Sequence, residues 1–202
     1  RETTIALNKI HLGIGRFRFY PRYLVAVNEK VIRQSAGDRA AMNCVKIIGE
    51  RGADAIPEDA LTYHVKTRQP KERFCKDIEC GLHEGWTVTF AALQVAYFLG
   101  FQEVVIVGMD HRFEYSGATN ESRRLDGRDP NHFSSEYFAD AQWDNPDLVR
   151  SEESYRIARD VFEADGKRIV DATVNGACDI FEKQDYRELF EVCGKVLDER
   201  VR

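Results

Sequence analysis

Several side chains suited to group transfer stand in and after a strongly apolar part of this sequence. Asp110 and Arg112 follow the β-branched run at residues 104–107, and His132 and Glu136 stand four residues apart in a polar segment further on. An imidazole has an unperturbed pKa near 6.5, so it can take a proton from a hydroxyl group near neutral pH. Arginine can stabilise the charge of a departing phosphate. His132 and Glu136 are therefore candidates for an acid–base group, and Arg112 is a candidate for a cation that binds an anion.

A second candidate lies at the start of a predicted helix. The segment "EGWTVT", residues 84–89, comes just before or within the first turn of that helix. Free N–H groups and the helix dipole favour an anion there, and Gly85 permits a close approach. The hydroxyl groups of Thr87 and Thr89 add donors. Threonine is also a common N-cap, so the segment is either a phosphate site or an ordinary helix start.

The elements that position these residues alternate between short β-branched runs and longer helical patterns. Such alternation is typical of βαβ units around a mostly parallel sheet. Strands are predicted over residues 4–7, 23–27, 44–48, 104–107 and 168–171, and helices over residues 87–99, 145–165 and 185–201. We therefore predict an α/β fold with a doubly wound, mostly parallel sheet and helices on both faces, Rossmann-like, in a single domain over residues 1–202.

Polar side chains follow the predicted strands. Asn8 comes after the first, Asn28 after the second and Asp110 after the fourth. Ligands of open α/β sheets bind beyond the carboxyl ends of the strands, although asparagine and aspartate also favour turns for local reasons. Together with the helix start, these positions predict one ligand-binding crevice formed by Asn8, Asn28, Gly85, Thr87, Thr89 and Asp110.

The segment 114–145 is polar and aromatic with little periodicity. A long unpatterned loop inside a domain is usually functional or disordered, and the aromatic residues argue against simple disorder. We expect an active-site loop that contains His132 and Glu136. The alternative is that His132 only forms structural contacts within its own loop.

Composition narrows the class of protein. The chain has 202 residues, 43% of them hydrophobic, and a net charge of -5, so it can bury a core but offers no clustered basic footprint for nucleic acid. Its five cysteines are odd in number and lack CxxC spacing, which favours reduced thiols and a cytoplasmic location. No apolar run reaches the length of a membrane span. No carboxylate cluster ends a strand, so we expect no metal site.

Four blocks of the sequence carry a family resemblance: "TIALNKIHLGI", "PRYLVAVNEKVIRQS", "EGWTVTFAALQVAYFLGFQEVVIVGMDH" and "DPNHFSSEYF". They resemble the 6-hydroxymethylpterin diphosphokinase MptE-like domain family. That family is related to the flagellin motility accessory factors and to the bacterial sialyltransferases of glycosyltransferase family 42.

The sialyltransferase branch implies a CMP-sugar donor and transfer of a nonulosonic acid, or a similar sugar, to a glycan or protein acceptor. By resemblance, Asn8 and Asn28 hold the cytidine nucleotide, Thr87 and Thr89 meet its phosphate, and His132 is the base. No cofactor besides the donor sugar nucleotide is implied. The diphosphokinase branch implies ATP and magnesium instead. A third reading is a non-catalytic module that binds nucleotide sugars, and a homo-oligomer also stays open.

Three departures from the family pattern stand out. The opening strand and its Gly-Asn-Gly-Pro-Ser loop are missing, so we expect the chain to lack an N-terminal part of the family domain. In the sialyltransferases the catalytic histidine follows another histidine by four residues, whereas His132 is followed at that distance by Glu136. Residues 35–81 match no pattern. The first and third departures leave activity and acceptor specificity open.

Overall fold

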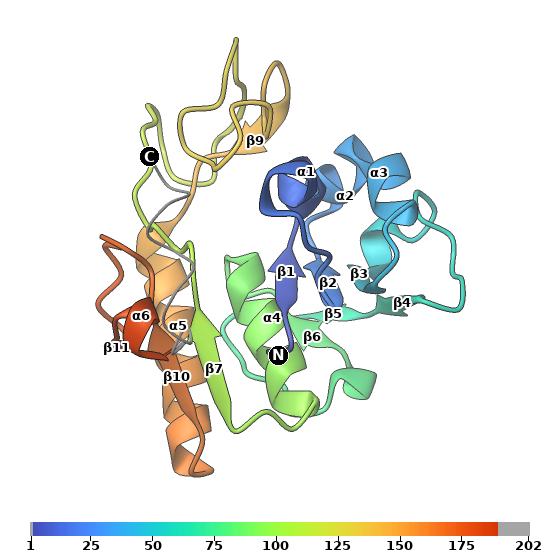
Figure 1. Cartoon of the computed structure of the whole chain (residues 1–202). Coiled ribbons are helices and arrows are strands. Elements are labelled where there is room, and N and C mark those ends of the chain that lie inside the picture. The colour runs from blue at the N-terminus through green and yellow to red at the C-terminus, as the bar shows by residue number, and fades with distance from the viewer. Residues whose placement is uncertain (1, 190–202) are drawn as a thin grey trace.

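Two separate parallel sheets form the framework of the protein (Figure 1). This computed structural model describes residues 2–189. The first sheet holds β1 (Ile5–Leu7), β2 (Tyr23–Ala26), β3 (Val45–Gly49) and β4 (Thr62–Val65), in that order. The second holds β11 (Glu182–Lys183), β10 (Arg168–Asp171) and β7 (Glu103–Ile106). Every pair in both sheets is parallel, which confirms the predicted α/β class with a parallel sheet.

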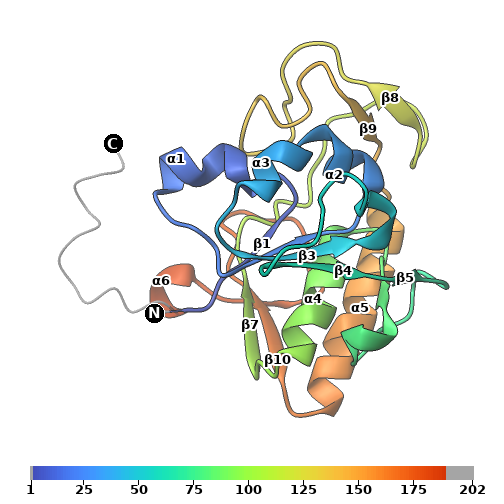
Figure 2. The ribbon, with the colours of Figure 1, turned by 90° about the vertical axis from the view of Figure 1, so that its right-hand side faces the viewer.

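The first sheet is buried on both faces. Val25 and Ile47 are register partners, and they pack with Ala91 and Val95 of α4 (Val88–Phe98). Successive residues of a strand point to opposite faces, so Ala26 and Ile48 pack on the other side, against Ile32 and Ile56. Figure 2 accordingly shows α1 (Ile14–Phe17), α2 (Glu29–Gln34) and α3 (Ala36–Ala40) on one side of this sheet, with α4 and α5 (Leu148–Ala164) on the other.

Helix α4 connects the two sheets. Its Ala91, Ala92 and Val95 belong to the core of the first sheet, while Phe90 and Leu93 pack with Ile106 and Ile169 of the second, and with Phe162 of α5. Thr87 is its N-cap, and Gly100, with φ of 85°, follows its end. Because α4 is covered on nearly all sides, it has no polar face.

The remaining helices are short. They are η1 (Ile10–Gly13), η2 (Glu50–Gly52), η3 (Ile78–Cys80) and α6 (Tyr186–Leu189). The predicted helix at residues 145–165 is α5, which begins at Leu148, three residues later than expected, because Asp147 is its N-cap. Of the helix predicted over residues 185–201, only α6 lies within the described residues. Among residues 2–189, none of the helices combines the length and the apolarity needed to cross a bilayer.

Several short strands were not predicted. They are β11, already placed in the second sheet, and β4, β5 (Thr67–Arg68), β6 (Leu82–His83), β8 (Ser122–Arg124) and β9 (Gln142–Asp144). The last two pair antiparallel inside the segment 114–145. That segment also contributes Tyr137, Phe138 and Trp143 to a small core with Val31. The expected unpatterned loop is therefore an ordered subdomain with a hairpin and a core of its own.

The β1 edge of the first sheet is unpaired within the described residues, because β1 pairs only with β2. The carbonyl group of Thr4 and the N–H group of Asn8 hydrogen-bond to β2 residues. N–H and C=O groups alternate in direction along a strand, so those of Ile5 and Leu7 point away from β2.

The β7 edge of the second sheet is free in the same way. The carbonyl groups of Gln102 and Ile106 accept hydrogen bonds from Arg168 and Ala172, at the two ends of β10. The backbone groups of Val105 therefore face away from β10. In Figure 1, β1 and β7 run in the same direction with α4 behind them. Two parallel edges of different sheets thus flank one helix.

Candidate functional site

His132 and Asp129 form a hydrogen-bonded pair in the segment 114–145. The imidazole Nδ1 lies 2.8 Å from the Asp129 carboxylate, which also accepts from the backbone N–H groups of Asn131 (2.8 Å) and Phe138 (3.1 Å). A carboxylate held this way accepts from Nδ1–H, which leaves the Nε2 lone pair free. Within residues 2–189, Nε2 has no hydrogen-bond partner. The pair therefore has the arrangement of a general base and the residue that orients it.

The surroundings of His132 keep its ring neutral. The ring stacks on Tyr137 at 4.1 Å between centroids and 11° between planes, and the edge of Phe138 lies 5.2 Å away. Burial lowers the pKa of His132 below its ordinary value and outweighs Asp129, which raises it. The side chain still exposes 22% of its surface. A neutral imidazole with a reachable Nε2 is the form that accepts a proton.

Lys9, which sequence reasoning did not single out, is buried beside this pair. Its Nζ donates to Gln34 Oε1 at 2.8 Å and to the Tyr137 carbonyl oxygen at 2.6 Å, and it lies 4.6 Å from the Phe138 ring centroid. Burial, and next the charge of Arg39, lower the pKa of Lys9 to about 8, against an opposing effect of Asp129. Lys9 directly follows Asn8, a predicted site residue, and could have been considered for that reason. The sequence gives no indication that this lysine is buried.

Asn8 adjoins the same cluster. Its φ of 47° is left-handed, which asparagine tolerates better than most residues. A hydrogen bond with the Asn8 side chain lowers the pKa of Tyr137, although burial dominates and raises that pKa overall. The Asn8 Oδ1 is buried and has no partner among the described residues. A buried carbonyl oxygen of this kind can accept a hydrogen bond from a ligand.

The other rim residues contribute less. Asp110 is exposed, and its charge is close enough to raise the pKa of His132, the smallest of the effects on that residue. Arg112 is exposed as well. Glu136 is also exposed, and its Oε1 accepts from the Ser135 hydroxyl group at 3.3 Å. Asn8, after β1, thus adjoins Tyr137, which stacks on His132, and Asp110, after β7, acts on His132 only through its charge.

Asn28 caps a helix. Its Oδ1 accepts from the N–H group of Val31 at 3.2 Å and makes it the N-cap of α2. The next lysine, Lys30, donates to Asp144 at 2.6 Å and so ties α2 to the hairpin of β8 and β9. The exposed side-chain NH₂ group of Asn28 remains available as a donor.

The start of α4 is explained by packing. Gly85 has φ of 58°, and a Cβ there would lie 2.1 Å from the ring of Phe90. Thr87 Oγ1 accepts from Thr89 N at 3.3 Å and lies 3.2 Å from the Tyr155 hydroxyl group. Burial raises the pKa of Tyr155 to about 12, while hydrogen bonds with Thr87 and Thr89 oppose that rise. Capping and packing therefore account for these residues without a phosphate.

His111 turns away from Asp110. It is buried with φ of 54°, its Nε2 lies 3.2 Å from Glu152 Oε1, and its ring centroid is 5.9 Å from that of Tyr155. After β7, Asp110 thus faces the segment 114–145, whereas His111 contacts α5. Over the part of the chain that the structure describes, no three His, Cys, Asp or Glu side chains gather in a group able to hold a metal ion.

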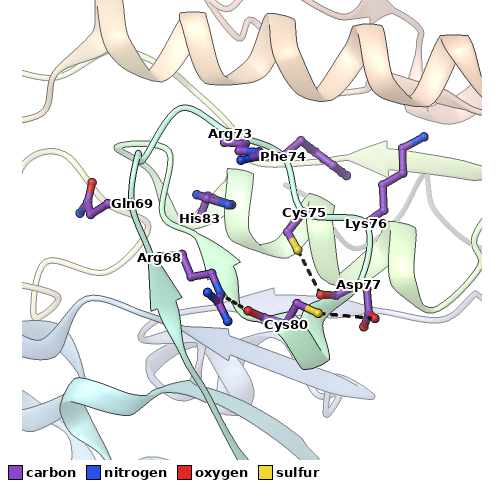
Figure 3. Close-up of a pocket in the computed structure, with 9 residues that line it drawn as sticks. All are labelled: Arg68, Gln69, Arg73, Phe74, Cys75, Lys76, Asp77, Cys80 and His83. Atoms are coloured by element: carbon purple, nitrogen blue, oxygen red, sulfur yellow. Dashed lines mark hydrogen bonds between the residues drawn. The ribbon is translucent and has the colours of Figure 1, made fainter.

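A cavity of about 520 Å³ lies elsewhere, between β5, β6 and the chain leading to η3 (Figure 3). Arg68, Arg73 and Lys76 line it, together with Cys75 and Cys80. The Cys75 thiol donates to the Asp77 carbonyl oxygen at 3.0 Å. None of the residues predicted for the nucleotide or for catalysis lines this cavity.

Comparison with known proteins finds no matching family model, no matching curated protein and no matching solved structure.

Proposed function

We propose that the protein is a sialyltransferase-like glycosyltransferase. It moves a nonulosonic acid, or a similar sugar, from a CMP-sugar to a hydroxyl group of a glycan or protein in the cytoplasm. The observation that carries the proposal is the His132–Asp129 pair, with Nε2 of His132 free and the ends of β1 and β7 nearby. In this proposal the two sheets belong to a doubly wound, Rossmann-like arrangement.

The proposed reaction needs one proton acceptor. The acceptor hydroxyl group gives its proton to Nε2 of His132, and its oxygen bonds to the anomeric carbon of the sugar. The bond from that carbon to the phosphate oxygen breaks, and CMP leaves with the electron pair. Asp129 stabilises the imidazolium that forms, and water then removes its proton. Arg112, exposed at the end of β7, is the cation proposed for the phosphate.

Asn8, Asn28 and Asp110 are proposed to hold the nucleotide. The unpaired Oδ1 of Asn8 suits the amino group of cytosine, and the free NH₂ group of Asn28 suits a base or ribose oxygen. The carboxylate of Asp110 suits a ribose hydroxyl group. The alternative at the start of α4, a phosphate on Thr87 and Thr89, is weaker because both hydroxyl groups already meet Tyr155.

The diphosphokinase alternative has less support. Magnesium with ATP wants several hard oxygen ligands. After β2 the chain reads Asn28-Glu29-Lys30, and Glu29 is paired with Arg33 at 2.9 Å while Lys30 is paired with Asp144 at 2.6 Å. The second alternative, a non-catalytic module, keeps the nucleotide site and differs only in turnover.

A thermal-shift panel tests the proposal. CMP, CMP-sialic acid, UDP-sugars, ATP and pterins are compared, with Asn8→Ala beside wild type and Asn175→Ala, a change after β10, as matched control. Ligand at about 100 times Kd stabilises by roughly 2.7 kcal/mol, so the cytidine ligands should raise the melting temperature and Asn8→Ala should reduce the rise. A larger response to ATP favours the diphosphokinase, and no response to CMP overturns the proposal. Transfer or hydrolysis of CMP-sialic acid then separates an enzyme from a binding module.

A further inference from the structure

A short basic and aromatic turn follows α1. Residues 16–22 read "RFRFYPR" and contain no acidic residue, in a chain whose net charge is -5. Arg16, Arg18 and Arg22 are exposed and alternate with exposed rings: Phe17 and Phe19 each expose 39% of their surface, and Tyr20 exposes 54%. We call residues 16–22 the arginine–aromatic turn. Its charge is opposite to that of the chain as a whole, so it favours an anionic partner.

The guanidinium groups of this turn are uncommitted. Arg33, Arg150 and Arg156 each bind a carboxylate of this chain. Across residues 2–189, by contrast, no ion pair or side-chain hydrogen bond involves the guanidinium group of Arg16, Arg18 or Arg22. A free guanidinium group can bind a carboxylate or sulfate with two parallel hydrogen bonds.

The aromatic rings of the turn are held in place. A Cβ on Gly13 would lie 2.2 Å from the Phe17 ring, so that ring packs directly on the glycine backbone. Arg18 ends α1 in a left-handed conformation with φ of 54°, which turns the chain at the surface. The rings of Phe17 and Phe19 lie 6.2 Å apart. The surface is thus preorganised.

A row of rings connects this turn to the proposed base. Phe17 lies 5.7 Å from Phe133, which exposes 42% of its surface, and Phe133 lies 5.7 Å edge-on to Tyr137. Tyr137 in turn stacks on His132 at 4.1 Å. An acceptor that rests on Phe17 and Phe133 is therefore directed toward His132.

We infer that the arginine–aromatic turn, with Phe133, binds an anionic glycan as the acceptor. The role of the glycan as acceptor rests on the proposed function, whereas the binding of an anionic glycan does not. Apolar faces of sugar rings pack on exposed aromatic rings, and the arginines pair with carboxylate or sulfate groups. A membrane surface fits less well because α1 has only four residues and forms no amphipathic helix. Nucleic acid fits less well because the turn offers only three arginines and the net charge of the chain is -5.

Isothermal titration calorimetry tests the inference with wild-type protein. The probes are oligosialic acid, hyaluronan and heparin oligosaccharides, with a neutral dextran oligosaccharide of matched length. We expect at least one anionic glycan to bind, more weakly as salt increases, and to outbind dextran. Arg16→Ala with Arg18→Ala should weaken it about tenfold or more, while Arg124→Ala, on β8 and also exposed, should change it less than twofold. Phe133→Ala should weaken the same glycan.

Three results would overturn the inference: no binding of any anionic glycan, binding that the arginine changes leave intact, or tighter binding to phosphatidylglycerol vesicles or to single-stranded oligo-dT. His132→Ala keeps the two proposals apart, since it should remove turnover and leave glycan affinity unchanged. Loss of the response to CMP with intact glycan binding counts against the proposed function alone. A response to CMP without glycan binding counts only against the inference that the arginine–aromatic turn binds an anionic glycan.

Discussion

At the scale of single residues, one buried carboxylate decides what His132 can do. Asp129 is almost fully buried and receives two backbone N–H bonds, so it stays in place and holds Nδ1 of the imidazole. The stacked ring of Tyr137 fixes the plane of the imidazole. Orientation of a base in this way is what distinguishes a positioned histidine from one that merely occupies a loop.

The first prediction concerns the base. His132→Ala should lower kcat for sugar transfer by roughly 10² to 10⁴-fold with little change in CMP affinity, because the residue acts on the acceptor and not on the nucleotide. Asn28→Ala should instead weaken CMP binding by about 1 to 3 kcal/mol. Steady-state kinetics and calorimetry with CMP check both. If Glu136→Ala abolishes turnover while His132→Ala does not, the base is Glu136.

The second prediction concerns Lys9 and pH. Its folded pKa of about 8 lies below the unfolded value near 10.4, so between these values the unfolded chain binds more protons. The stability that this residue contributes is therefore full above about pH 10 and is lost as pH falls through about 8. Between pH 8 and 10 the free energy of unfolding should therefore rise, and Lys9→Met should remove roughly 1 to 3 kcal/mol of that rise. Urea unfolding of both proteins across that range measures it, and equal pH slopes would contradict it.

His132 was singled out through the family resemblance, and its role as the base stays a prediction. Asp129 and Lys9 were not singled out, although both are close to predicted residues in the sequence. What makes them important is burial next to an imidazole, and burial depends on how the segment 114–145 folds onto the end of β1. Local sequence does not contain that contact.

At the scale of elements, the start of α4 shows how a packing requirement can look like a binding motif. A glycine before two threonines suggested a phosphate, yet the ring of Phe90 occupies the place of a Gly85 side chain. The hydroxyl group of Thr87 is taken by the cap and by Tyr155. The same residue types serve both purposes, so only the structure separates them.

The third prediction follows from Gly85. Gly85→Ala should destabilise the protein by about 2 to 5 kcal/mol, because it adds a clash with Phe90 to the strain of a positive φ. Gly100→Ala is the matched control: its φ is also positive, but a Cβ there meets nothing within 4 Å, so it should cost only about 1 kcal/mol. Denaturant unfolding measures both. Equal losses would show that the Phe90 contact is unimportant.

Whether a helix or strand could be predicted from the sequence depended on its side chains. The predicted strand at residues 168–171 coincides with β10, and the helix over residues 87–99 matches α4 with its cap. Strand β4 escaped because Thr62, Tyr63 and His64 leave no apolar run in its sequence. Strands β8 and β9 escaped because a hairpin of charged residues lacks the usual alternation.

The fourth prediction addresses the unpaired edges. Amide hydrogens of Leu7 and Val105, which point away from their sheets, should exchange with solvent at least tenfold faster than those of Ala6 and Ile106, which point toward β2 and β10. Hydrogen exchange followed by NMR resolves single residues and makes the comparison within each strand. Equal protection would mean that the edges are covered.

At the scale of the whole molecule, one buried helix, α4, holds together the two larger parallel sheets. The sequence pattern predicted the order of strand and helix, because hydrophobic periodicity is local. It did not predict the separation of the sheets, which depends on which strands pair. The resemblance to the MptE-like family stays a prediction, and so does the expectation of an N-terminal strand and glycine-rich loop.

The β1 and β7 edges have a consequence for concentrated solutions. Both are templates for strand pairing, and they belong to different sheets whose edges run in the same direction beside α4 (Figure 1). A contact in which β1 of one copy meets β7 of the next is head-to-tail, and unless its rotation closes a ring it leaves a free edge at each end. Association through these edges would therefore produce a closed ring or, where the rotation does not close, a filament of indefinite length, instead of a two-fold dimer. For a filament, light scattering should rise with concentration without reaching a plateau, and a proline at Val105 should suppress it.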